Sequence, residues 1–78
     1  MKRALIVDDD DQFRLLLKRM LQRYYDFNVF EATNGEKGIE LFEKEKPHII
    51  FLDINMPKLN GLQFLEKVNP FNSNIPIV

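Results

Sequence analysis

The sequence predicts an α/β fold built on a doubly wound parallel sheet. Two apolar runs, residues 4–7 and 48–52, are continuous rather than alternating, which is typical of strands covered by helices on both faces. Segments with helical periodicity lie around them, so strands and helices alternate along the chain. The first run ends at Asp8 and Asp9, and the second ends at Asp53. Because the carboxyl ends of parallel strands form the active edge of such a sheet, we expect the three aspartates to meet there.

An amphipathic helix of about four turns is expected after the first strand. Apolar side chains recur at three- and four-residue spacing and predict a core-facing stripe: Phe13, Leu16, Leu17, Met20, Leu21 and Tyr24. Arg14 and Lys18 are among the polar residues that fill the positions between them. Asp10 and Asp11 are interpreted as caps of this helix, since acidic groups are favourable at a helix N-terminus.

The next segment predicts a second strand and a second helix. Residues 27–32 have the aromatic and β-branched content of a short strand. Thr33 and Glu36 have the capping-box spacing, in which the threonine hydroxyl and the glutamate each satisfy a main-chain N–H at the start of a helix. Ile39 and Phe42 are expected to face the core from this helix.

The remaining residues extend the alternation. Residues 54–61 are a loop by their Pro, Asn and Gly content, and residues 62–68 predict a third, shorter helix. After a turn at 69–74, the apolar residues 75–78 begin a fourth strand. The predicted order is therefore strand, helix, strand, helix, strand, helix, strand, with right-handed crossovers.

Composition limits the class of protein. Seventy-eight residues make one domain at most, and the absence of cysteine excludes disulfides and thiolate metal sites. Eleven basic and twelve acidic residues are interspersed, which argues against nucleic-acid binding by this chain. The start is too short for a signal peptide and no run has the length of a membrane span. We expect a cytoplasmic protein.

The three aspartates are candidates for a metal site. A hard divalent cation such as Mg²⁺ takes oxygen ligands, and crowded carboxylates raise one another's pKa unless a cation is present. Asp9 and Asp53 fit the role of ligands, and Asp8 could act through a bound water. Asp53 stands alone at its strand end and is the better candidate for a nucleophile that attacks phosphorus. The competing interpretation is that Asp8 and Asp9 only cap the first helix.

Two other groups of side chains have plainer interpretations. His48, the one histidine, follows a proline at a strand entrance opposite the acidic edge, so we interpret it as a surface residue. Four aromatic side chains could in principle stack on nucleic-acid bases. They lack surrounding basic residues and are interpreted as core: Tyr24, Tyr25, Phe27 and Phe30.

The spaced motifs resemble those of a known family. They are Leu5-Ile6-Val7-Asp8-Asp9, Ala32, Asn34-Gly35, Leu52-Asp53-Ile54-Asn55-Met56-Pro57 and Gly61. Together, over residues 2–78, they resemble the receiver domain of bacterial response regulators in two-component signalling. The resemblance implies a flavodoxin-like sheet with strand order 2-1-3-4-5.

The resemblance also implies roles for named residues. Asp53 would accept a phosphoryl group from a sensor histidine kinase, in a protein that is not itself an enzyme. Asp9, Asp53 and the main-chain carbonyl of Asn55 would bind Mg²⁺, and Asp8 would help through a bound water.

A departure from the family pattern leads to a second hypothesis. The family closes its fourth strand with Ser or Thr and its fifth with Lys, and residues 1–78 contain neither position, so we expect a partial, N-terminal receiver domain with no output domain. An open apolar edge then predicts a homodimer or larger homo-oligomer that completes the fold, for example by exchange of elements.

Two functions therefore stay open. The first is a phosphoacceptor that uses Asp53 and Mg²⁺. The alternative is a fragment that lacks phosphorylation competence and acts as a self-associating or kinase-competing interaction module. An autonomous hydrolase has little support, because no separate general base or activated nucleophile is visible.

Overall fold

The computed structural model describes residues 2–53 of the chain. They form β1 (Arg3–Val7), α1 (Asp11–Tyr24), β2 (Asn28–Ala32), α2 (Gly35–Glu45) and β3 (Ile49–Leu52). The predicted order of elements is confirmed over this range, and each strand begins within one residue of its predicted first position. The loop at 54–61, the third helix at 62–68 and the fourth strand at 75–78 lie outside the described residues.

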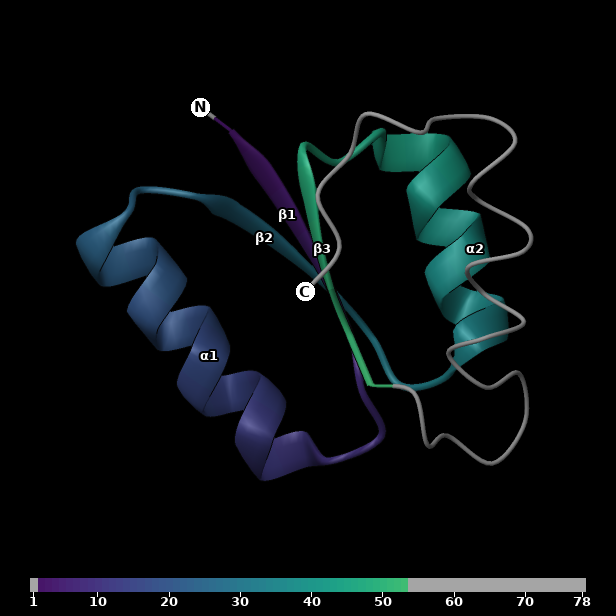
Figure 1. The fold of residues 1–78 in the computed structure, drawn as a ribbon, viewed down its shortest axis with the longest axis horizontal. Helices are drawn as coiled ribbons and strands as arrows, with labels where there is room; N and C mark the ends of the chain where they lie inside the picture. The colour runs from purple at the N-terminus through teal and green to yellow at the C-terminus, as the bar shows by residue number, and fades with distance from the viewer. Residues whose placement is uncertain (1, 54–78) are drawn as a thin grey trace.

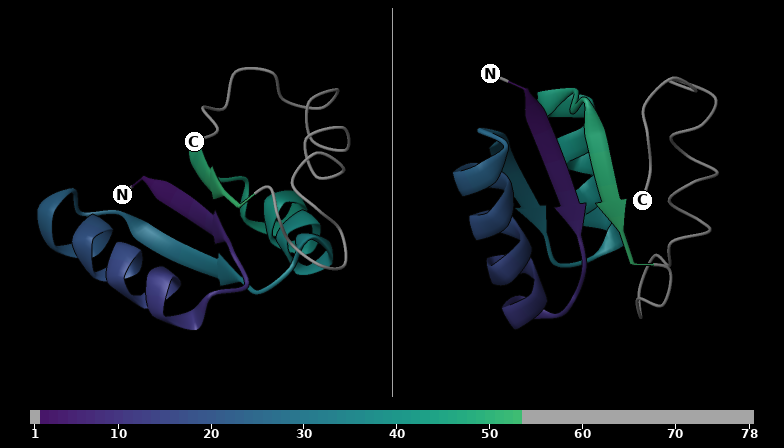
Figure 2. Two further views of the ribbon diagram at one scale, coloured as in Figure 1. Left: turned by 60° about the horizontal axis from the view of Figure 1, so that its bottom comes forward. Right: turned by 60° about the vertical axis from the view of Figure 1, so that its left-hand side comes forward.

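The three strands form a parallel sheet with the order β2-β1-β3. The central strand β1 pairs with both neighbours, and Val7 lies opposite Ala32 on one side and Leu52 on the other. Helices α1 and α2 lie on opposite faces of the sheet (Figure 1). A doubly wound parallel sheet is therefore confirmed for the described part of the chain, and the register brings the carboxyl ends of all three strands to one edge (Figure 2).

The core has one layer on each face of the sheet. Leu5 and Val7 point to the α2 side, where they cluster with Ala32, Phe42 and Ile50. The alternate residues of β1 point to the α1 side, where Ala4 and Ile6 cluster with Leu21. All four apolar residues of β1 from Ala4 to Val7 are fully buried. This two-sided burial is the physical reason for a continuous apolar run, because neither face of the strand meets water.

Helix α1 faces the sheet with a different stripe from the one predicted. The positions turned inward are 14, 17, 18 and 21, of which Arg14 and Leu21 are buried. The remaining predicted core positions are instead exposed, by between 45% and 68% of each side chain's surface: Phe13, Leu16, Met20 and Tyr24. They lie on the flank next to the inward stripe, about 100° around the helix axis.

The prediction for the aromatic residues is also partly wrong. Tyr25, which follows α1, is 67% exposed, as Tyr24 is on the helix. Phe27 and Phe30 are partly buried against the two core clusters, as expected of core residues. The two tyrosines stand at the end of α1, where the chain turns toward β2.

Both helices begin with a side-chain cap. Asp10 is the N-cap of α1, as predicted, and its carboxylate accepts hydrogen bonds from the N–H groups of Gln12 and Phe13 at 3.0 and 3.2 Å. The cap of α2 is Asn34 rather than the predicted Thr33, and the Asn34 side chain accepts from the N–H of Lys37 at 2.9 Å. Both residues are good caps, and the structure starts the helix one residue later.

The opposite edge of the sheet is held by Arg3 and His48. The Arg3 side chain donates to the main-chain oxygens of Glu45 and Lys46 at the end of α2, where Lys46 takes a left-handed conformation with φ of 50°. His48 is exposed, as predicted, and its Nδ1 accepts from the Arg3 N–H at 3.0 Å. These contacts are structural and far from the aspartates. Neither described helix is long and apolar enough to cross a membrane.

Candidate functional site

The aspartates are placed by main-chain hydrogen bonds that continue the sheet past its strands. The N–H of Asp8, which follows β1, donates to the carbonyl of Ala32 at 3.1 Å. The N–H of Asp53, which follows β3, donates to the carbonyl of Val7 at 2.9 Å. Because both residues are held by the neighbouring strand, the rigid sheet fixes where their side chains begin.

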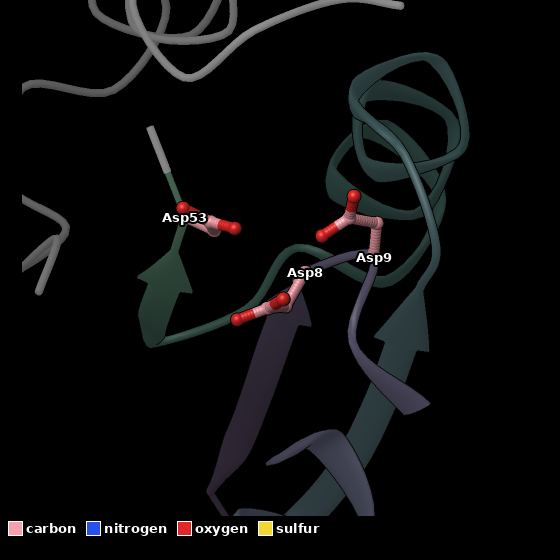
Figure 3. A group of neighbouring side chains, drawn as sticks. All are labelled: Asp8, Asp9 and Asp53. Carbon is pink, nitrogen blue, oxygen red and sulfur yellow. The ribbon is translucent and has the colours of Figure 1, made fainter. Parts of the chain in front are cut away.

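The three carboxylates come together as the sequence predicts. Asp8, Asp9 and Asp53 each offer an oxygen, and these atoms all lie within 4.8 Å of one another. The carboxylates of Asp9 and Asp53 point toward each other from the segments that follow β1 and β3 (Figure 3). Asp9 is exposed, whereas Asp8 and Asp53 are half-buried. The fourth predicted ligand, the carbonyl of Asn55, lies outside the described residues.

Asp8 has the least favourable environment for a negative charge. Burial raises the pKa of its carboxyl group, and the negative charges of Asp53, Asp9 and Asp10 raise the pKa further. A hydrogen bond from the Asp10 N–H to Asp8 Oδ1, at 2.9 Å, acts in the opposite direction but does not cancel the burial. The predicted effect of crowding on pKa is therefore confirmed for Asp8, although burial is the larger cause.

The raised pKa predicts how Asp8 affects stability in the absence of Mg²⁺. The folded chain binds this proton more tightly than the unfolded chain, so ionisation of Asp8 lowers the free energy of unfolding. This loss of stability is absent at pH values below the pKa of Asp8 in the unfolded chain. It is complete at pH values above the raised pKa of Asp8 in the folded chain. Asp8→Asn is therefore expected to gain stability over wild type at about pH 7, and to gain much less at about pH 3, in urea unfolding with chelator present.

Glu43→Gln is the matched control for this experiment, because it removes one exposed carboxylate far from the cluster. Its stability difference from wild type should change little between the two pH values. An Asp8→Asn variant that is less stable than wild type at neutral pH would contradict the assigned environment.

The donor set fits a magnesium ion. Oxygen ligands of an octahedral Mg²⁺ lie roughly 3 to 4 Å apart, so carboxylates within 4.8 Å need only small side-chain rotations to share one ion. Three carboxylates fill at most half of an octahedral coordination shell, which leaves positions for water or a phosphoryl oxygen as further ligands. Asp9 and Asp53 would hold the ion directly, and half-buried Asp8 would hold it through water.

Comparison with known proteins decides the family. A model described as the response regulator receiver domain matches residues 4–78. The chain belongs to this family. Receiver domains act as phosphoacceptors in two-component response regulators, contact sensor histidine kinases, and bind Mg²⁺ at an acidic pocket.

Individual relatives agree with this assignment. The chain is 35% identical to the chemotaxis protein CheY of Thermotoga maritima over 99% of its own length and 64% of the relative's. It is 45% identical to the nitrate/nitrite response regulator protein NarL of Escherichia coli over 82% of its own length and 30% of the relative's. The chain therefore spans between about a third and two thirds of these curated relatives.

Solved structures show the same fold. The response regulator protein TrrA of Thermotoga maritima, crystallised in complex with Mg²⁺ and BeF, aligns with a TM-score of 0.90 and 34% identity. The alignment covers 99% of this chain and 66% of that one. This likeness, together with the β2-β1-β3 order, confirms the predicted flavodoxin-like receiver fold.

One residue that contacts this site was missed by the sequence reasoning. The apolar spacing places Arg14 among the polar residues between core positions, yet it is the only buried polar or charged residue of the described range. Its Nη1 donates to the carbonyl of Asp8 at 2.7 Å. The sequence does hold a signal, because residues 14, 17 and 21 share one face of a helix, so an inward Leu17 and Leu21 imply an inward Arg14.

Proposed function

We propose that this chain is a phosphoacceptor in which Asp53 takes a phosphoryl group from a sensor histidine kinase, with Mg²⁺ held by Asp8, Asp9, Asp53 and the carbonyl of Asn55. One observation carries the proposal. The Asp53 carboxylate lies with those of Asp8 and Asp9 at the carboxyl edge of the sheet. A nucleophile and a cation site are thereby combined, as phosphoryl transfer requires.

The transfer itself is a displacement at phosphorus. A carboxylate oxygen of Asp53 forms a bond to phosphorus while the bond from phosphorus to the kinase imidazole nitrogen breaks, and that nitrogen keeps the electron pair. Mg²⁺, when bound, neutralises charge on the transferring phosphoryl oxygens. The sheet keeps the Asp53 main chain in place through its hydrogen bond to Val7, so the nucleophile is oriented before the donor arrives.

The proposal is tested by the intact mass of the chain after incubation with acetyl phosphate, a donor that needs no kinase. The expected result is a gain of one phosphoryl group with Mg²⁺ and none when a chelator removes the cation. No gain at saturating Mg²⁺ would overturn the proposal for residues 1–78 and favour the interaction-module alternative.

Several finer predictions accompany this proposal. We place the chain in the cytoplasm, where a sensor kinase would present its phosphohistidine, and assign it no enzymatic activity of its own. That residues 1–78 are the N-terminal part of a longer receiver domain also stays a prediction.

Self-association is the second candidate function, and the exposed flank of α1 favours it. Phe13, Leu16, Met20 and Tyr24 together form an apolar patch on one helix, which is a common feature of protein contact surfaces. The predicted homodimer or larger assembly would bury this patch. A light-scattering mass above that of one chain at micromolar concentration is expected, and a folded monomer would contradict it.

A further inference from the structure

Arg14 holds the segment that carries two of the three carboxylates. Its guanidinium donates from Nη1 to the main-chain oxygen of Asp8 and from Nη2 to the carboxylate of Asp11. These two acceptors lie on either side of Asp9, so one side chain holds both ends of the turn on which Asp9 stands. The Asp8 N–H is meanwhile bound to Ala32, so the main chain just before Asp9 is restrained from β2 and from α1.

The guanidinium is itself held in place from the far side. Nε lies 3.4 Å from Glu31 Oε1 on β2, an ion pair without a hydrogen bond, and Glu31 also pairs with Lys18 at 3.3 Å. The Arg14 side chain is only 9% exposed, so it has few alternative rotamers and little water to compete for its donors. A planar fork of this kind fixes the orientation of its acceptors, which a single ammonium group cannot do for two separated oxygens.

We propose that Arg14 is a positioning residue for the cation site, which holds the turn at residues 8–11 so that the Asp9 carboxylate faces Asp53. This inference rests on the proposed function, since it assumes that the aspartates bind Mg²⁺. Arg14 does not touch the ion. It acts through the carbonyl of Asp8 and the carboxylate of Asp11.

A positioning role and a purely electrostatic role of Arg14 predict opposite changes in Mg²⁺ affinity when Arg14 is replaced. A buried positive charge beside a cation site repels the cation, so its loss would strengthen Mg²⁺ binding if charge were its main influence. If Arg14 holds the ligand geometry, its loss weakens Mg²⁺ binding despite the removed repulsion. Changes to residues that orient metal ligands typically cost about 10- to 100-fold in affinity, which is larger than the screened effect of one charge.

The test measures the dissociation constant of Mg²⁺ by calorimetric titration of the 78-residue chain and its variants. Arg14→Gln removes the charge and the fork, and Arg14→Lys keeps the charge but not the fork. Both are expected to raise the dissociation constant, by about tenfold for Arg14→Gln. Lys18→Gln is the matched control, because it removes one charge from the same cluster without a contact to Asp8. It should bind Mg²⁺ as tightly as wild type or more tightly.

A second control separates a positioning role of Arg14 from a role in stabilising the fold alone. Glu31→Gln weakens the ion pairs of the cluster and should lower the urea midpoint, while its Mg²⁺ affinity stays within about twofold of wild type because the bonds to Asp8 and Asp11 remain. If circular dichroism shows that Arg14→Gln does not fold, the Mg²⁺ affinity of Arg14→Lys tests the positioning role instead.

The outcomes separate this inference from the proposed function. Unchanged or tighter Mg²⁺ binding in the Arg14 variants, with wild-type binding intact, overturns the positioning role alone. A wild-type chain that binds no Mg²⁺ overturns both the positioning role and the proposed function.

Discussion

Replacement of Asp53 by asparagine is expected to abolish phosphoryl uptake while the fold is kept. The amide has nearly the shape of the carboxylate, and the main-chain bond from residue 53 to Val7 does not involve the side chain. An amide lacks the anionic oxygen that attacks phosphorus, so no acyl phosphate can form at this position. Loss of one of the three negative charges should at the same time relieve the repulsion on Asp8 and leave the unfolding midpoint equal to or above that of wild type.

The measurement is the intact mass with acetyl phosphate, followed over time for wild type, Asp53→Asn and Asp9→Asn. Asp9→Asn keeps the nucleophile but removes a carboxylate that is proposed to bind the cation. Its uptake should be slow and should recover in part as the Mg²⁺ concentration rises, whereas Asp53→Asn should stay unmodified at every concentration. Uptake by Asp53→Asn would show that another residue is the acceptor.

Much of the site could be predicted because its position follows from strand ends. Continuous apolar runs identify buried parallel strands, and the residue after each run must stand at the carboxyl edge of the sheet. Asp8, Asp9 and Asp53 meet for this reason, although about forty residues separate the two runs. The environment of Asp8 was harder to anticipate, because burial rather than neighbouring charge is the main cause of its raised pKa.

Helix α1 shows what the sequence pattern does not contain. A stripe of apolar residues identifies the apolar side of a helix but not which part of it meets the sheet. Contacts with β2 turn Leu17 and Leu21 inward, and Arg14 with them, while Phe13 and Leu16 remain exposed. Arg14 is tolerated there because Asp8, Asp11 and Glu31 surround its guanidinium, and only the folded arrangement reveals those partners.

The second large effect is expected from Leu5→Ala in the centre of the sheet. Leu5 is fully buried in β1, between Phe30 of β2 and Ile50 of β3. A buried Leu→Ala substitution costs about 2 to 5 kcal/mol, because the lost contacts leave a cavity that the neighbours fill only in part. A chain of 78 residues has a total stability of roughly 4 to 12 kcal/mol. The variant should therefore lose a large fraction of its stability, measured as a lower urea midpoint.

Leu16→Ala is the matched control, because it removes the same atoms from a side chain that is 62% exposed on α1. From its exposure in a single chain, its unfolding free energy should change by no more than about 0.5 kcal/mol, and by more only where the predicted self-association buries the patch. If Leu16→Ala instead costs as much as Leu5→Ala, the flank of α1 is buried in solution by a surface outside the described residues. Urea unfolding at several protein concentrations then identifies that surface. If a second copy of the chain covers the flank, the urea midpoint falls on dilution, and if the same chain covers it, the urea midpoint does not depend on concentration.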